Sequence, residues 1–117
     1  MTSVFTRIID REIPAEIVYE DDLVIAFRDI APRAPVHLLV VPKTEDYANV
    51  VELAAGDPAL LGHIVATAQA LAAEHTGGDF RLVFNTGAGA GQTVFHVHAH
   101  VMGDGAAPLD EGSLDEL

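Results

Sequence analysis

The 117-residue chain contains no cysteine. Without cysteine it has no disulfide framework, no thiolate zinc site and no cysteine nucleophile. Any chemistry that the protein performs must therefore use other groups.

Basic residues are scarce, with six Lys and Arg against eighteen Asp and Glu, which gives a formal net charge of −12. This charge repels polyanions, so we expect no nucleic-acid polymer as a partner. A small phosphate-bearing metabolite remains compatible with it, because screening at physiological salt limits the far field to about 8 Å.

Long hydrophobic runs are also missing, although half of the residues are hydrophobic. No run approaches the roughly 18 residues that a membrane span needs, and residues 1–7 lack the regions of a signal peptide. We therefore expect a cytoplasmic protein with no membrane partner. The length fits one domain. Because periodicity is lost after Gly103, we assign residues 1–104 to this domain and 105–117 to an acidic, loosely ordered tail.

Hydrophobic periodicity and turn residues predict the secondary structure. Five strands are expected, at residues 17–20, 24–27, 36–41, 80–84 and 93–102. Three helices are expected: a short one capped by Ser3 and ending after Ile13, a second capped by Thr44 and running through Leu53, and a main helix from Asp57-Pro58 to Gly77-Gly78. The predicted fold class is α+β, a five-stranded, mostly antiparallel sheet with one main helix and a short N-terminal helix.

Residues 93–102 are the most informative stretch, because His96, His98 and His100 alternate there with apolar residues. A period of two is that of a β-strand, which predicts an outward imidazole row and an inward row that begins with Phe95. Neighbouring histidines would stand about 6.6 Å apart, close enough to act on one small substrate. Since β-propensity gives no reason to choose histidine, the row predicts chemistry.

Imidazoles can bind metals, or act as nucleophiles and acid–base groups. A metal site usually adds a carboxylate, and the next ones are Asp104 and Asp110, although His37 could approach from a neighbouring strand. We therefore expect no metal. A neutral imidazole, with a pKa of about 6.5, is instead a good nucleophile at phosphorus near neutral pH.

A glycine-rich segment, residues 87–91, precedes the histidines and is followed by Gln92 and Thr93. Its amides could bind an anion, and the two polar side chains would add donors. A glycine-rich hairpin turn is an equally good interpretation. Because a strand follows, the segment is neither a Walker A motif nor a dinucleotide fingerprint.

The run His96-Val97-His98-Ala99-His100-Val101-Met102 matches the H-φ-H-φ-H-φ-φ signature, with φ apolar, of the histidine triad (HIT) family of nucleotide hydrolases and transferases. Other segments resemble the Hint branch of that family, which acts on purine nucleoside phosphoramidates. They are Phe5 to Pro14, Glu20-Asp21-Asp22, Phe27-Arg28-Asp29-Ile30, Ala34-Pro35-Val36-His37, Val40-Val41-Pro42-Lys43 and Gly91-Gln92-Thr93-Val94. The resemblance covers roughly residues 5–103.

This resemblance implies a role for each matching residue. His98 would be the nucleophile that takes up a nucleoside monophosphate, with His100 and His96 as its partners and His37 as the fourth histidine of the network. Asp29 would accept the ribose hydroxyls. The residues implied for the phosphate or leaving group are Asn85, Gly91, Gln92 and Thr93, and those implied for the base slot are Phe5, Ile8, Ile13, Phe27 and Ile30.

The resemblance also implies a homodimer that pairs through the main helix and a sheet edge, and no cofactor. It predicts hydrolysis of purine nucleoside 5′-phosphoramidates to the nucleoside monophosphate and an amine. The alternatives are a diadenosine polyphosphate hydrolase, a nucleotide-binding interaction protein and a metal-binding protein. The tail departs from the family, since it lacks the aromatic residue that many members carry there.

Overall fold

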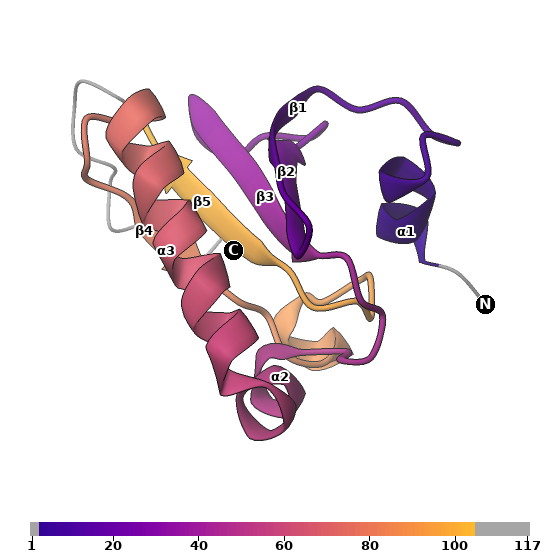
Figure 1. Cartoon of the computed structure of the whole chain (residues 1–117). Helices are drawn as coiled ribbons and strands as arrows, with labels where there is room; N and C mark the ends of the chain where they lie inside the picture. Colours follow the sequence, from indigo (N-terminus) through magenta and orange to yellow (C-terminus); the bar gives the residue numbers. More distant parts are fainter. Residues whose placement is uncertain (1–2, 105–117) are drawn as a thin grey trace.

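Five strands form a single antiparallel sheet in a computed structural model that describes residues 3–104. The strands are β1 (Ile17–Glu20), β2 (Val24–Arg28), β3 (Val36–Pro42), β4 (Arg81–Val83) and β5 (Ala99–Gly103). Their order is β1-β2-β3-β5-β4, so the histidine-bearing strand lies between β3 and β4 (Figure 1). The predicted fold class is confirmed. The predicted acidic tail lies outside the described residues.

The helices are α1 (Val4–Ile9), α2 (Val50–Gly56) and α3 (Pro58–His75), and a 3₁₀ turn, η1, spans Ala88–Ala90. The main helix begins as predicted, because the Asp57 side chain accepts a hydrogen bond from the Leu60 N–H and Pro58 occupies the first helical position. Figure 1 shows α3 across one face of the sheet and α1 on the other side.

Each face of the sheet has its own apolar core. On β2, Val24 and Ala26 belong to the core beneath α3, whereas Ile25 and Phe27 belong to the core beneath α1. All four side chains are buried, because α1 and α3 cover opposite faces of the same strand. Strand β2 therefore has no solvent face over residues 24–27.

The first helix is shorter than predicted and ends at Ile9, not at Ile13. Arg11 has a φ of 63°, which is left-handed backbone, and the Glu12 and Ile13 N–H groups both donate to the Arg7 carbonyl. The helix therefore ends in a local turn before Pro14 is reached.

The second helix begins later than predicted, at Val50, and its cap is Asn49, whose side chain accepts from the Glu52 N–H at 2.9 Å. Thr44 instead accepts from the Asp46 N–H through its hydroxyl. A threonine in such a local turn is bonded to its own backbone and does not start a helix.

The histidine strand is also shorter than predicted, since β5 begins at Ala99 and residues 94–96 form a bend. The predicted orientation is wrong at its start: Phe95 is 58% exposed and His96 only 1%. The N-terminal part of α1 covers the His96 ring, because Ser3 is bonded to it and the Phe5 ring lies 5.8 Å from it. The bend at residues 94–96 takes Phe95 out of the alternation of the strand. The predicted inward row is confirmed from Val97 onward, where Val97, Ala99 and Val101 are buried.

Among residues 3–104, no helix is both long enough and apolar enough to cross a membrane.

Candidate active site

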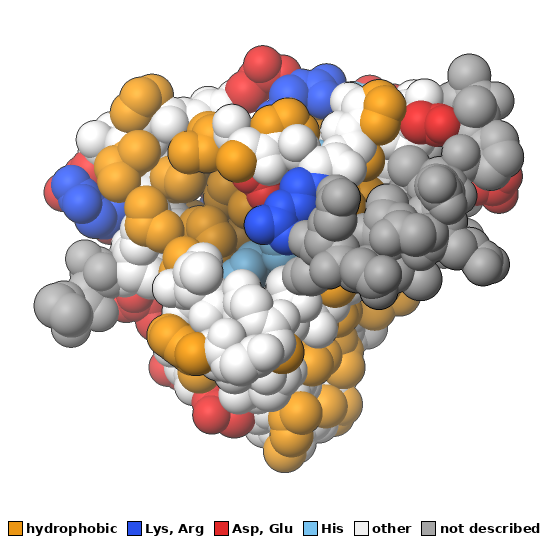
Figure 2. Space-filling model, turned by 180° about the vertical axis from the view of Figure 1, so that it is seen from behind, with side chains coloured by type: hydrophobic (Ala, Val, Ile, Leu, Met, Phe, Trp, Pro, Cys, Tyr) orange, Lys and Arg blue, Asp and Glu red, His pale blue; other side chains and the backbone are white. Residues whose placement is uncertain are grey.

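The sheet brings the predicted histidines together. Leu39 of β3 is paired with His100 of β5, which places His37, two residues earlier on β3, diagonally beside His100. The ring centroids of His37 and His100 are 5.2 Å apart, and those of His98 and His100 are 5.1 Å apart. Figure 2 shows histidine side chains at the floor of a hollow, with hydrophobic side chains on one side of it and basic side chains on the other.

The hydrogen bonds of His98 determine its tautomer. Its Nδ1 lies 2.9 Å from the backbone carbonyl oxygen of His96, and a carbonyl oxygen can only accept. The ring proton is therefore on Nδ1, and Nε2 carries the lone pair of a nucleophile.

His37 and His100 form a second chain of hydrogen bonds. The Arg33 backbone N–H donates to His37 Nδ1 at 3.0 Å, so the proton of His37 is on Nε2. That group donates to His100 Nδ1 at 2.9 Å, which places the proton of His100 on Nε2. His100 Nε2 is buried and has no hydrogen-bond partner among the described residues. A buried donor without a partner costs free energy, so this N–H is suited to an oxygen acceptor brought by a substrate.

The environment keeps the histidines neutral. Burial is the main cause that lowers the pKa values of His37, His96 and His98 below the ordinary 6.5. Burial, with His98 and His37 nearby, lowers the pKa of His100 to about 4. At neutral pH His100 is therefore a hydrogen-bond donor and not a proton source.

Asp29 lies at the edge of the histidine network. One of its carboxylate oxygens is 3.4 Å from His37 Nε2, and the other accepts from the Ala31 N–H at 2.8 Å. The carboxylate thus both caps a turn and faces the histidines.

The apolar residues predicted for a base slot divide into two groups. Phe5, Ile8 and Phe27 are buried in the core beneath α1, and Ile13 packs against that core. The Phe5 ring lies edge-on to His98, with centroids 4.9 Å apart and planes at 72°. Ile30 is 95% exposed and is not brought into this group.

Four amides of the glycine-rich loop are already hydrogen-bonded and are therefore not open as predicted. The Gly87 carbonyl accepts from the N–H groups of Ala90 and Gln92, and the Ala88 carbonyl accepts from the Gly91 N–H. The Gly87 N–H donates to the side-chain oxygen of Gln92. Gly87 and Gly91 have φ values of 90° and 93°, which favour glycine. The glycines therefore shape the loop.

The three polar residues around this loop, Asn85, Gln92 and Thr93, differ in burial and in position. Gln92 is buried, and its amide group donates to the carbonyls of Ala48 and Val94. Thr93 is exposed. Asn85 follows β4, whose Val83 is paired with His100, so antiparallel pairing directs Asn85 toward the His98 end of the row.

Asp29, His37 and His100 could hold a metal ion, since each offers a ligand atom and these atoms lie within 4.8 Å of one another. Two of these atoms, His37 Nε2 and His100 Nδ1, already share a hydrogen bond. A metal ion would have to replace that bond.

Sequence reasoning missed two groups that organise the site. Ser3 was predicted only as a helix cap, but its Oγ also lies 2.6 Å from His96 Nδ1. Pro42 was noted only as part of a segment that resembles the family, but its carbonyl oxygen lies 2.7 Å from His96 Nε2. Ser3 and His96 are 93 residues apart in the sequence, and Pro42 and His96 are 54 residues apart. No sequence pattern indicates contacts over such separations.

Comparisons with known proteins identify the family of this chain. Residues 10–106 match the HIT domain family model. The chain is 55% identical over 103 residues to an uncharacterized HIT-like protein of Synechococcus elongatus, covering 86% of this chain and 89% of that protein. It is 41% identical over 103 residues to the purine nucleoside phosphoramidase of Escherichia coli, covering 86% of each.

Solved structures give the same result. The HIT family hydrolase from Legionella pneumophila superposes with a TM-score of 0.86 at 38% identity, covering 96% of this chain and 99% of that chain. The HIT family hydrolase from Clostridium thermocellum superposes with a TM-score of 0.84 at 41% identity, covering 94% of this chain and 96% of that chain. The chain therefore belongs to the HIT family, and its fold is that of the HIT family hydrolases.

Proposed function

We propose that this protein hydrolyses purine nucleoside 5′-phosphoramidates in the cytoplasm, giving the nucleoside monophosphate and an amine. The observation that carries the proposal is the tautomer of His98, whose Nδ1–H is fixed by the His96 carbonyl so that Nε2 is free to attack. The similarity to a purine nucleoside phosphoramidase supports the choice of substrate.

In the first step, His98 Nε2 forms a bond to phosphorus as the bond from phosphorus to the amine nitrogen breaks. The amine leaves with the electron pair of that bond and takes a proton from solvent. The His96 carbonyl stabilises the positive charge that develops on the His98 ring, because it accepts the Nδ1–H bond. The His100 Nε2–H donates to a phosphate oxygen, which is the acceptor that it lacks in the described residues.

In the second step, water attacks the phosphorus of the nucleotidyl-histidine as the bond from phosphorus to Nε2 breaks. His98 leaves with the electron pair as neutral imidazole, and the proton of the attacking water passes to solvent. The burial that lowers the pKa of His98 favours this neutral leaving form. We assign Asp29 to the ribose hydroxyls and the apolar residues around Phe5 to the base. Asn85, Gly91, Gln92 and Thr93 are assigned to the phosphate side.

The direct test is steady-state hydrolysis of a fluorogenic adenosine phosphoramidate at neutral pH with EDTA present. We expect turnover by the wild type and a loss of at least about 10³-fold with His98→Ala, because the nucleophile is missing. His75→Ala, which changes a histidine in the last turn of α3, is the matched control and should keep wild-type turnover.

Diadenosine polyphosphate, assayed side by side, separates the two hydrolase candidates. Preference for it would replace the proposed substrate class. Equal turnover by His98→Ala and wild type would contradict the mechanism, and turnover that EDTA abolishes would indicate a metal at Asp29, His37 and His100.

We also propose a homodimer that pairs through α3. Val65, Ala66 and Ala70 are exposed on this helix, and their small side chains allow close approach. Light scattering coupled to size exclusion should give twice the chain mass for the wild type and the single-chain mass for Ala66→Glu. A wild-type protein of single-chain mass at micromolar concentration would contradict this proposal.

A further inference from the structure

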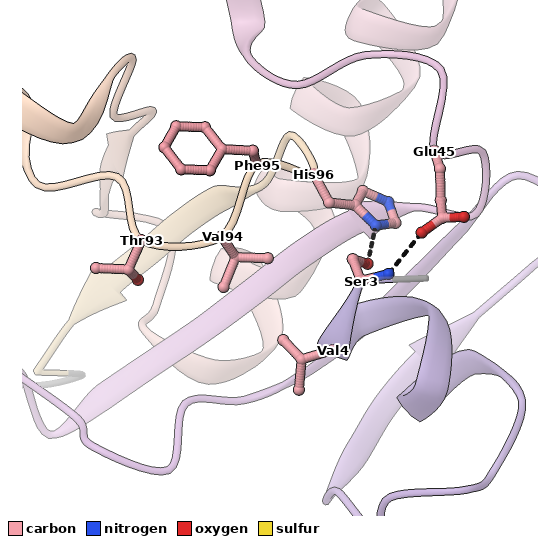
Figure 3. Close-up of a pocket in the computed structure, with 7 residues that line it drawn as sticks. All are labelled: Ser3, Val4, Glu45, Thr93, Val94, Phe95 and His96. Atoms are coloured by element: carbon pink, nitrogen blue, oxygen red, sulfur yellow. Dashed lines mark hydrogen bonds between the residues drawn. The ribbon is translucent and has the colours of Figure 1, made fainter. Parts of the chain in front are cut away.

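The N-terminus of α1 is bonded directly to the histidine row. Figure 3 shows Ser3 and His96 facing each other at the edge of an open cavity, with Ser3 Oγ 2.6 Å from His96 Nδ1. His96 Nε2 lies 2.7 Å from the Pro42 carbonyl oxygen, so the ring proton is on Nε2. Nδ1 therefore accepts, and the Ser3 hydroxyl donates to it.

The remaining bonds of Ser3 fix the direction of this hydroxyl. Its oxygen accepts from the Thr6 N–H at 3.1 Å, which is the helix-capping bond. Its backbone N–H donates to Glu45 Oε1 at 2.7 Å, and Figure 3 shows this carboxylate on the opposite side of Ser3 from Val4. The hydroxyl also lies 3.4 Å from Thr6 Oγ1, but the 2.6 Å contact with His96 Nδ1 is far shorter, so the hydroxyl proton is directed to His96.

His96 in turn sets the position of the nucleophile. Its ring is held at both nitrogens, and its carbonyl oxygen accepts the Nδ1–H of His98 at 2.9 Å. Phe5, two residues beyond Ser3, also places its ring edge against His98. One turn of α1 therefore contacts both histidines.

We propose that Ser3 is a positioning residue for the hydrolysis, acting through His96 to hold the carbonyl that fixes the His98 tautomer and the direction of Nε2. This inference rests on the proposed function. Because Ser3 acts through the His96 ring, its loss should lower kcat and leave substrate binding nearly unchanged.

Three substitutions separate this role from helix capping. Ser3→Ala removes the hydroxyl and the cap, Ser3→Gly removes the hydroxyl but caps almost as well, and Ser3→Thr keeps both. We expect kcat to fall on the order of tenfold in both the alanine and the glycine variants, since small displacements of a reacting group are costly. KM should stay within about twofold, and Ser3→Thr should keep kcat within about twofold of wild type.

The nitrogen-15 NMR shifts of the imidazole rings provide a readout that does not depend on activity. In the wild type, His96 Nδ1 should show the shift of an acceptor bonded to a hydroxyl, and this shift should move in Ser3→Gly and Ser3→Ala but not in Ser3→Thr. A merely structural cap would not change it selectively.

Two results would overturn the inference. The first is a loss of kcat in Ser3→Ala that Ser3→Gly does not share, because capping alone would then explain the loss. The second is an unchanged His96 Nδ1 shift in both variants. Absence of turnover in the wild type would instead contradict the proposed function, and the NMR comparison would still decide whether Ser3 holds His96.

Discussion

His98 has its reactivity set by groups that are apolar or uncharged. Its Nδ1–H is bonded to a backbone carbonyl, its neighbour is the Phe5 ring, and burial lowers its pKa. The alternation of histidines in the sequence correctly identified the residues that meet. It could not reveal the tautomers, because these depend on the carbonyls of His96 and Pro42 and on the Arg33 N–H.

The pH dependence of kcat/KM follows from the lowered pKa values. His98 must be neutral to attack, and a pKa below 6.5 keeps it neutral at pH values where a free imidazole is already protonated. We expect kcat/KM to stay constant from pH 8 to about 6.5 and to fall only at lower pH. The measurement is initial rates at low substrate concentration across pH 4.5–8, corrected for spontaneous hydrolysis. An acid limb with an apparent pKa above 6.5 would contradict this environment for His98.

Helix α1 is the element whose contribution was hardest to predict. Its sequence indicated a short capped helix, which is confirmed, but nothing in it indicated that the helix covers the second face of the sheet. That cover buries His96, while the bend at residues 94–96 exposes Phe95, so the predicted orientation is wrong at both residues. The two-residue alternation of the histidine stretch was real, but packing against a distant segment decided which of its side chains are buried. Helix α3, which has its own cap and apolar stripe, was predicted almost to its ends.

Strand β5 gives a prediction about packing at its C-terminal end. A methyl group on Gly103 would lie 2.6 Å from Thr76 Cγ2 and 3.2 Å from the Asp79 carbonyl oxygen. Gly103→Ala should therefore lower the free energy of unfolding by about 1–3 kcal/mol, the usual cost of overpacking.

The matched control is Gly89→Ala in the 3₁₀ turn, where the added methyl group meets nothing within 4 Å. It should raise the free energy of unfolding by about 0.4–1 kcal/mol, because alanine leaves the unfolded chain less conformational freedom than glycine does. Urea unfolding measures both changes. Equal stabilities of the two variants would show that β5 is not packed against the end of α3 as described.

The whole molecule has two cores on one sheet, with the histidines where β3 and β5 meet the cover of α1. The α+β class was predictable because most strands and the main helix carry strong local signals. The order β1-β2-β3-β5-β4 was not, since antiparallel pairing between β3 and β5 depends on contacts about 60 residues apart.

The burial of four imidazoles predicts a loss of stability in mild acid. Their folded pKa values lie below the unfolded value of 6.5, so between these values the unfolded chain binds protons that the folded chain does not. The free energy of unfolding should fall as the pH falls below 6.5, by at most about 1.4 kcal/mol per pH unit for each group.

The pKa of His100 is lowered the furthest, to about 4, so protonation of this histidine should lower the free energy of unfolding over the widest pH range. Replacing it by glutamine removes one titrating group and should make the decrease between pH 6.5 and 5 less steep. Urea unfolding at closely spaced pH values gives the slope. The same slope in His100→Gln and wild type would contradict the lowered pKa of His100.

Trapping the covalent intermediate tests the central proposal most directly. Wild-type protein is mixed with an adenosine phosphoramidate, quenched within one turnover in alkaline denaturant, where a phosphorus–histidine bond survives, and examined by intact-mass and peptide mass spectrometry. We expect an adenylyl group on the peptide that contains His98, and none in His98→Ala. Rapid turnover without such an adduct, or an adduct on a different residue, would contradict nucleophilic attack by His98.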